Sequence, residues 1–246
     1  MYKTHPDVHT PNGNKIIWRY MSIDKFLHLI VQGKLYFSRL SKMTDKYEGT
    51  VPELMFRKKI IEILQSESDK AWENIHKEKK YLEEFRDKTF INCWSIDRDE
   101  SYALWKIYLS GSSCGVAIKT TVSKLRKSLE KVKGNPDFFI GEVDYKVQFP
   151  IYPPNPQQLC VYKREFYKYE KELRAFFVME DSAFNENPSI KELDGWNVDI
   201  DINTLIDSIY LSPFTGGWFE ASFRSIIEHI KPELVPLIQS SEIKDE

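Results

Sequence analysis

The chain opens on a strand–helix–strand pattern of apolar and polar positions. Residues 16–20 form a short apolar and aromatic run, which predicts a strand. Apolar residues then recur at the spacing of one buried helix face, and Gly33 provides the stop signal for that helix. Residues 34–38 alternate between apolar and polar side chains, with Tyr36 and Ser38 on the polar face of a second strand.

The rest of the pattern predicts an irregular mixture of helices and strands. Residues 51–87 are heavily charged but keep apolar residues at helical spacing, which predicts two outer helices broken near residues 66–68. Further strands are expected at residues 89–95, 114–119, 138–145, 170–179, 198–202 and 208–212, and further helices at 100–109, 122–131, 157–168 and 218–230. The proline-rich residues 150–156 predict an extended loop. Because helices and strands do not alternate regularly, the expected fold class is α+β, with a mixed β-sheet core and peripheral helices.

A single domain accounts for the length of 246 residues, because no linker rich in Pro, Gly or Ser divides the chain. Residues 1–15 are polar and carry two prolines and a glycine, which predicts a flexible leader. Residues 16–231 form the predicted α+β domain. Residues 232–246 are expected to be a polar C-terminal tail.

Composition narrows the possible function classes. Lys and Arg number 35 against 37 Asp and Glu, and this balance argues against a dedicated DNA-binding module, although it is compatible with a local basic groove. The three cysteines and five histidines are scattered, so their spacing predicts neither a disulfide framework nor a metal site. No apolar run reaches the roughly 18 residues that span a bilayer, and the N-terminus lacks the apolar core of a signal peptide. We therefore expect a cytoplasmic protein without a membrane partner.

The most informative chemistry lies in the segment Tyr169–Arg174. If this segment is a strand, Glu170, Glu172 and Arg174 share one of its faces. The arginine would keep at least one carboxylate ionised, and an ionised carboxylate can stabilise a sugar oxocarbenium ion or activate an incoming nucleophile. The same row of charges is also typical of a cross-strand salt-bridge ladder on an exposed strand.

A second cluster comes from the first two predicted strands. Arg19 and Tyr20 end the first strand, and Ser38 and Arg39 end the second. An arginine at a strand end is suited to a pyrophosphate, because its planar fork binds phosphate oxygens in pairs. The serine can orient a carboxylate or a ribose hydroxyl, but taken singly Ser38 is more typical of a strand end and Tyr20 of a core edge. Trp105 is expected in the core, and stacking against a nicotinamide or adenine ring is the alternative.

Other motifs carry less information. Asp45 and Glu48 lie in a short loop, where two carboxylates without further ligands are typical of a turn rather than of a metal site. No glycine pattern matches a P-loop or a dinucleotide-binding turn, and no Gly-x-Ser-x-Gly elbow is present. We therefore expect no metal and no acyl hydrolysis.

The order of these motifs resembles the bacterial family known as domain of unknown function 2971. The matching pieces lie between about residues 16 and 212 and are Trp18-Arg19-Tyr20, Gly33 to Ser38, Asp45 to Glu48, Cys93-Trp94-Ser95, Trp105 with Tyr108 and Gly115, and Glu170-x-Glu172-x-Arg174. The layout is also similar to that of the ADP-ribosyltransferase superfamily. Arginine-type members of that superfamily carry an Arg, a Ser and a Glu-x-Glu on successive strands.

This resemblance implies an ADP-ribosyltransferase-like fold and transfer of ADP-ribose from NAD to a macromolecular acceptor, protein or nucleic acid, by a toxin or phage-defence effector. Arg19 would hold the phosphates or ribose of NAD, and Ser38 would position the glutamate. Glu172 would be the catalytic carboxylate, and Glu170 would assist the acceptor. The residues expected to bind the cofactor are Arg19, Tyr20, Ser38, Trp105 and Arg174.

Two alternatives remain open from the sequence. One is a non-catalytic binding or sensing module of a defence system, which would bind nucleic acid or protein through the charged helices of residues 51–87. The other is hydrolysis of NAD or another nucleotide, which would use the same residues as the transfer reaction.

Overall fold

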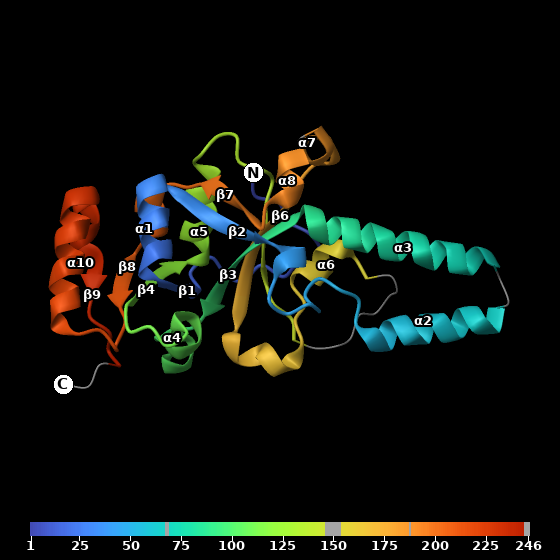
Figure 1. The fold of residues 1–246 in the computed structure, drawn as a ribbon, viewed down its shortest axis with the longest axis horizontal. Helices are drawn as coiled ribbons and strands as arrows, with labels where there is room; N and C mark the ends of the chain where they lie inside the picture. The colour runs from blue at the N-terminus through green and yellow to red at the C-terminus, as the bar shows by residue number, and fades with distance from the viewer. Residues whose placement is uncertain (67–68, 146–153, 187, 244–246) are drawn as a thin grey trace.

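The computed structural model describes residues 1–66, 69–145, 154–186 and 188–243. Within them a mostly antiparallel sheet of nine strands forms the centre, and helices surround it (Figure 1). The strands are β1 (Ile16–Ser22), β2 (Lys34–Arg39), β3 (Thr89–Ile96), β4 (Gly115–Thr121), β5 (Phe139–Glu142), β6 (Glu172–Val178), β7 (Gly195–Asp199), β8 (Ser208–Leu211) and β9 (Ile238–Gln239). The helices are α1 (Ile23–Gln32), α2 (Glu53–Ser66), α3 (Asp69–Lys88), α4 (Tyr102–Leu109), α5 (Val122–Glu130), α6 (Pro156–Cys160), α7 (Asp181–Glu186), α8 (Pro188–Glu192), α9 (Ile202–Leu205) and α10 (Gly217–Ile230), with the 3-10 helices η1 (Leu40–Lys42), η2 (Glu165–Glu170) and η3 (Pro232–Leu237). The expected α+β class is confirmed.

The sheet branches at β3. The main strand order is β5-β6-β3-β1-β4-β8-β9, and β2 joins β3 as a branch that also carries β7. β1 pairs with the end of β3, at Ser95 and Ile96. β2 pairs with the beginning of β3, at Phe90 and Ile91. β1 and β2 therefore diverge beside residues 92–94, and we call the gap between them the fork.

Helix α1 connects β1 to β2, the two strands on either side of the fork. Its residues Phe26, Leu29 and Ile30 are buried, as the apolar spacing predicted. Gly33 ends the helix in the left-handed conformation, with φ of 66°, and its N–H donates to the carbonyl of Leu29. This turn sends the chain directly into β2, which runs antiparallel to β3 as β1 does.

Alternation along β6 separates the core from the polar face. Leu173, Ala175 and Phe177 belong to the main hydrophobic cluster. Successive side chains of a strand point to opposite faces of the sheet. Glu172 and Arg174 therefore lie together on the opposite face, as the sequence pattern predicted for these two residues.

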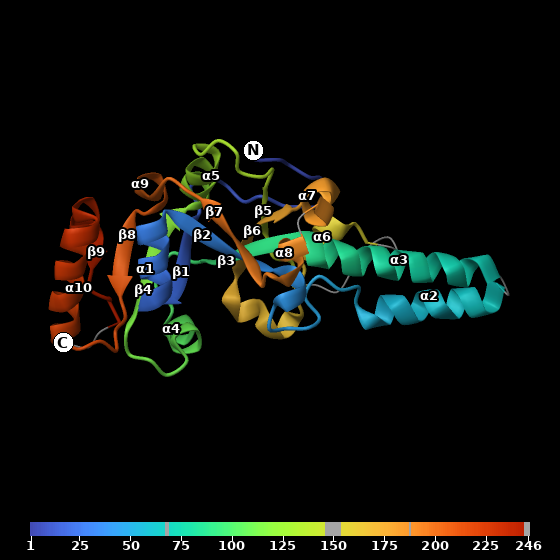
Figure 2. The same cartoon turned by 45° about the horizontal axis from the view of Figure 1, so that its top comes forward.

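Helices α2 and α3 form a pair that projects away from the sheet (Figures 1 and 2). They are the two helices expected over residues 51–87. Of the predicted break between them, residues 67–68 lie outside the described residues. The predicted loop at residues 150–156 also lies mostly outside them, and residue 156 already belongs to α6.

Residues 1–15 and 232–243 pack against the sheet, in contrast to the expectation of a flexible leader and a polar C-terminal tail. Within residues 1–15, Thr10 Oγ1 donates to the carbonyl of Ile140 on β5 at 2.6 Å. Val8 is buried in the same region. Residues 232–246 contain η3 and β9, and β9 pairs in parallel with β8. Apolar side chains in both segments are buried, which explains why these segments stay attached.

The segment before β6 differs most from its prediction. The helix expected over residues 157–168 is wrong, because α6 ends at Cys160 and a separate 3-10 helix, η2, follows. The strand expected from Glu170 begins only at Glu172. Lys171 between them has φ of 44°, a left-handed conformation that interrupts the extended backbone.

Candidate functional site

A pocket of about 1060 Å³ opens at the fork. Its lining includes five of the side chains expected at the site, namely Arg19, Tyr20, Ser38, Glu170 and Glu172. The other two expected residues, Trp105 and Arg174, lie outside the lining. The first two strands and the acidic segment before and in β6 therefore meet around one cavity.

Residues 92–94 of β3 pair with neither β1 nor β2. Side-chain hydrogen bonds connect the strands at this place instead. Arg19 Nη1 donates to the carbonyl of Cys93 at 2.6 Å, and the guanidinium lies 5.9 Å from the ring centroid of Trp94. Asn92 Nδ2 donates to the carbonyl of Tyr36 at 2.8 Å. In the part of the chain that the structure describes, no carboxylate forms an ion pair with Arg19. An arginine in this state is suited to bind an anion that enters the pocket.

Five charged side chains form a cluster at the β6 end of the pocket, and we call them the charge cluster: Glu48, Lys163, Glu170, Glu172 and Arg174. Lys163 Nζ lies 2.5 Å from Glu172 Oε1 and 3.1 Å from Glu170 Oε2. The same ammonium lies 3.2 Å from Glu48 Oε1. Arg174 Nε lies 2.7 Å from Glu172 Oε2, and Arg174 Nη2 pairs with Glu48 Oε2. Each cation is therefore shared between carboxylates, which offsets part of the cost of burying them.

Hydrogen bonds to the backbone hold this cluster in place. The N–H of Glu172 donates to the hydroxyl of Tyr145 at 2.8 Å. Ser95 Oγ, from the neighbouring strand β3, donates to the carbonyl of Glu170 at 2.8 Å. Arg174 Nη1 donates to the carbonyl of Cys160 at the end of α6, at 2.9 Å. The start of β6 is therefore tied to β3, to α6 and to the segment after β5.

The two glutamates of the cluster differ in their acidity. Burial alone would raise the pKa of Glu172, but the charges of Arg174 and Lys163 outweigh it and hold that pKa well below its ordinary value. Burial, together with the nearby Glu172 carboxylate, raises the pKa of Glu170 to about 7. Near neutral pH, Glu172 is thus ionised, whereas Glu170 is divided between its two forms.

This difference makes stability depend on pH in a defined direction. The pKa of Glu170, about 7 in the folded chain, lies above its ordinary value of 4.5. Between these values the folded chain binds more protons, so the free energy of unfolding from this group decreases as pH rises. Glu172 acts in the opposite sense, because its lowered pKa makes its stabilisation disappear as pH falls below 4.5.

The melting temperature of the wild type should fall between about pH 5 and about pH 8 as Glu170 loses its proton. We expect a smaller fall in Glu170→Gln, because the amide does not titrate. Thermal unfolding followed by circular dichroism over that range measures the effect. The matched control is Glu165→Gln, which changes a carboxylate with 69% side-chain exposure on the same 3-10 helix. An identical decline in wild type and Glu170→Gln would contradict the shifted acidity of Glu170.

Trp105 lies in the core, as the sequence indicated, and outside the pocket lining, so the alternative role of stacking against a ligand ring finds no support. This side chain is fully buried. Its Nε1 donates to Glu100 Oε2 at 2.9 Å, and its ring meets that of Tyr20 edge-on at 5.0 Å. One helical turn later, Tyr108 is 42% exposed and lines the pocket. Tyr108 therefore provides the aromatic surface that the sequence assigned to Trp105.

Two arginines expected near a ligand serve the fold instead. Arg174 has no exposed surface, and its guanidinium is occupied by the carboxylates of the charge cluster and a backbone carbonyl. It positions Glu172 and does not reach a cofactor, so its expected cofactor-binding role is wrong. Arg39 is also buried, and its guanidinium donates to the carbonyls of Asp87, Ile190 and Leu193. Because both guanidinium groups are buried and already donate to these partners, neither is available to a phosphate.

Tyr20 and Ser38 take different places in the lining. Tyr20 is 5% exposed, and its hydroxyl accepts a hydrogen bond from the N–H of Ser101 at 2.8 Å. It therefore chiefly fixes the start of α4. Ser38 is half-buried on β2, where it pairs with Ile91 of β3, and it lines the pocket.

Several residues of the site have no predicted role in the sequence. Glu48 was read as a turn residue, although the piece Asp45 to Glu48 formed part of the family resemblance. Lys163 was placed within a predicted helix, and nothing in its local sequence distinguishes it from a surface lysine. Tyr108 offered a usable signal, because it lies three residues after Trp105, at the spacing of one helix face.

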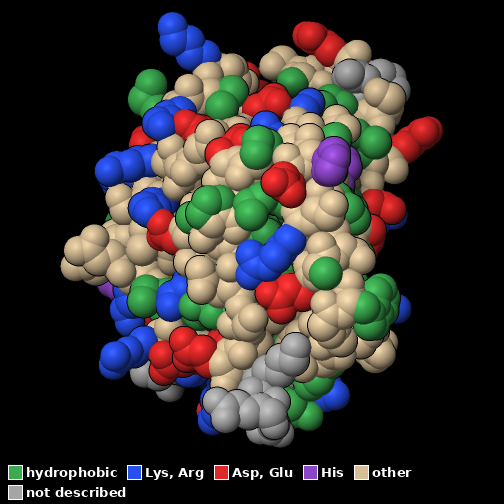
Figure 3. Space-filling model, turned by 90° about the vertical axis from the view of Figure 1, so that its left-hand side faces the viewer, with side chains coloured by type: hydrophobic (Ala, Val, Ile, Leu, Met, Phe, Trp, Pro, Cys, Tyr) green, Lys and Arg blue, Asp and Glu red, His purple; other side chains and the backbone are tan. Residues whose placement is uncertain are grey.

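Metal and membrane features complete the description of the surface and the site. Among the described residues, no group of three or more His, Cys, Asp or Glu side chains is placed to hold a metal ion. No helix in the described ranges is long and apolar enough to cross a membrane. The face on the α10 side carries Lys and Arg interspersed with Asp and Glu (Figure 3).

Comparisons with protein-family models, with curated proteins and with solved structures found no match to this chain. Its function is therefore inferred from the geometry and the electrostatics of the pocket.

Proposed function

We propose that this protein transfers ADP-ribose from NAD to a macromolecular acceptor. The observation that supports the proposal is the shared lining of one pocket by Arg19, which has no carboxylate partner among the described residues, and by the carboxylates of Glu170 and Glu172. The pocket volume, about 1060 Å³, slightly exceeds the roughly 300–1,000 Å³ of ordinary ligand pockets. A dinucleotide is a ligand of that size.

The two glutamates suit the two halves of a ribosyl transfer. Glu172 stays ionised and stabilises the positive charge that develops at the anomeric carbon as its bond to nicotinamide breaks. The electron pair of that bond leaves with nicotinamide. Glu170, with a pKa of about 7, accepts the proton of the acceptor nucleophile as the nucleophile's lone pair forms the new bond to the same carbon.

The remaining lining residues hold the substrate. The Arg19 guanidinium binds a phosphate of NAD, because it offers free N–H donors in a planar array. The Ser38 hydroxyl orients a ribose hydroxyl or the glutamate beside it. The exposed face of Tyr108 packs against the nicotinamide ring, in the place that the sequence assigned to Trp105.

The test is the release of nicotinamide from NAD by the purified full chain, supplied with protein and nucleic acid fractions from its own cell. We expect release together with labelled acceptor, and a rate about 10²-fold lower in Glu170→Gln, since a general base contributes at least that factor. Glu165→Gln, the exposed neighbour on η2, should retain the wild-type rate. If free ADP-ribose is the sole product, the reaction is hydrolysis of NAD and not transfer to an acceptor. A purified chain that does not cleave NAD in the presence of these fractions would contradict the proposal.

A further inference from the structure

The pocket has two ends that differ in charge and in the elements that form them. One end contains the carboxylates of the charge cluster. The other end is lined by side chains of α1 and β2, including Lys25, His28, Lys34 and Tyr36. Arg19 lies between the two ends, in the fork. The roles proposed for the two glutamates concern the ribose that carries nicotinamide, so they do not say which part of NAD lies at the α1–β2 end.

The polar face of β2 connects the two ends. Lys34, Tyr36 and Ser38 line the pocket at intervals of two residues. Leu35 and Phe37, which alternate with them, belong to the hydrophobic core. With about 3.3 Å per residue, the row from Lys34 to Ser38 covers about 13 Å. A ligand whose ribose lies near Ser38 therefore reaches Lys34 only if it is long.

Tyr36 presents a flat aromatic surface at the α1–β2 end. Its side chain is 41% exposed. The ring lies against Gly195, where a Cβ atom would come within 2.3 Å of the ring, so only glycine leaves room for this position. On the neighbouring strand β7, Asn197 pairs with Tyr36, and its Oδ1 lies 3.4 Å from His28 Nε2. Helix α1 therefore approaches the strand pair beside this ring.

The cations of this end are available to an anion. Lys25 is exposed and forms no ion pair with any described residue. Lys34 Nζ lies 3.7 Å from Asp199, with 39% and 54% of the two side chains exposed. An ion pair of this kind contributes little in water and is easily exchanged. Asp24 is the carboxylate that lines the pocket beside them.

We propose that Tyr36, Lys25 and Lys34 form the subsite for the adenosine diphosphate half of the dinucleotide. Adenine lies against the ring of Tyr36, and the two phosphates lie between the lysines and Arg19. An aromatic face binds a nucleobase by stacking, and lysines bind phosphate oxygens as compact charges. This inference rests on the proposed function, because it sets which end of NAD reaches Glu172.

The experiment uses ADP and nicotinamide riboside, which carries no phosphate, as separate probes of the full-length chain in calorimetric titrations. We expect Lys25→Glu combined with Lys34→Glu to weaken ADP binding at least tenfold and to leave the affinity for the riboside within about twofold. Tyr36→Ala should weaken ADP about tenfold, whereas Tyr36→Phe should keep its affinity, because stacking needs only the ring.

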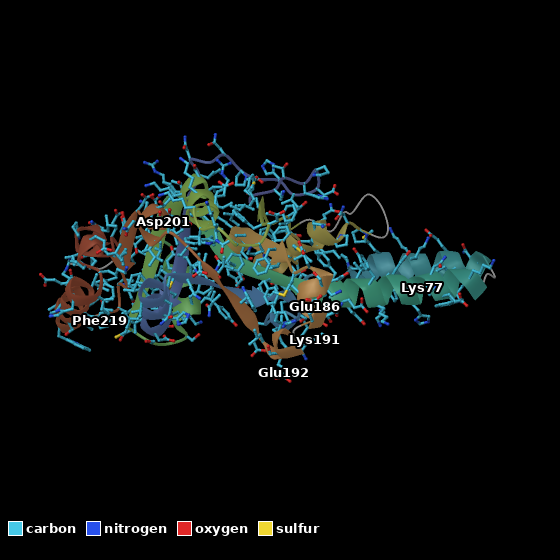
Figure 4. The ribbon with its side chains drawn as sticks, turned by 90° about the horizontal axis from the view of Figure 1, so that it is seen from above. Lys77, Glu186, Lys191, Glu192, Asp201 and Phe219 are labelled. Atoms are coloured by element: carbon cyan, nitrogen blue, oxygen red, sulfur yellow. The ribbon has the colours of Figure 1, made fainter. Side chains whose placement is uncertain are left out.

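The matched control is Lys70→Glu with Lys77→Glu, which makes the same charge change on exposed lysines of α3 that do not line the pocket. Lys77 lies on the part of α3 that projects away from the sheet (Figure 4). An equal loss of ADP affinity in this control, or no loss in the pocket variant, would overturn the subsite. Nicotinamide release by a wild type that does not bind ADP would overturn the subsite but not the proposed function. Lysine-dependent ADP binding without NAD cleavage would support the subsite and contradict the proposed function.

Discussion

Replacing Glu172 by glutamine is expected to lower the rate of nicotinamide release about 10³-fold and the free energy of unfolding by about 3–5 kcal/mol. The amide keeps the shape of the carboxylate but cannot stabilise a developing positive charge. The substitution also removes one of the carboxylates that neutralise the buried side chains of Arg174 and Lys163. A buried charge without its partner is costly, so stability falls as well as activity. Nicotinamide release well below the melting temperature and denaturant unfolding measure the two effects separately.

The second variant that separates these effects is Glu172→Gln with Arg174→Met. Removing the arginine as well leaves Lys163 with Glu48 and Glu170, so the charges are again nearly matched. We expect the double variant to recover part of the lost stability but none of the activity. Activity of Glu172→Gln within tenfold of the wild type would contradict a catalytic role for Glu172. Unchanged stability would contradict its buried ion pairs.

Replacing Lys163 by methionine is expected to shift the pH dependence of the reaction to higher pH and to lower stability by about 3–5 kcal/mol. In the wild type the rate should rise through about pH 7 and then level off, because Glu170 has a pKa of about 7 and acts only when deprotonated. The Lys163 charge lowers the pKa of both Glu170 and Glu172. Its loss therefore leaves less of the basic form of Glu170 at neutral pH.

The control variants for this experiment are chosen from the groups around Glu170, because these groups influence its pKa. They are Lys163, Glu172, Tyr169 and Tyr108. Lys163→Arg keeps the positive charge and should retain the wild-type pH profile. Lys168→Met removes a charge with 68% exposure on the same segment and should change neither profile nor stability. A pH–rate profile in Lys163→Met that superimposes on the wild type would show that this lysine does not set the state of Glu170.

Most local elements could be predicted because their signals are local. The run from β1 through α1 to β2 was predicted almost to the residue, since apolar spacing and Gly33 act over one or two helical turns. The alternation that places Glu172 and Arg174 on one face also follows from neighbouring residues. The prediction failed over residues 157–168, where the apolar spacing suited a helix but tertiary contacts divided the segment.

The sequence by itself determined the order of the elements, the α+β class and the candidates Glu170 and Glu172, because each depends on residue type and spacing along one segment. Arg19 and Ser38 became candidates through the family resemblance. Only the tertiary structure decided that Lys163 and Glu48 meet these glutamates, since contacts between distant segments depend on how loops cross the sheet. It also decided that Glu170 and Glu172, the same residue type two positions apart, differ in acidity. Burial and the distance to a cation set a carboxylate's pKa, and neither quantity is defined until the chain has folded.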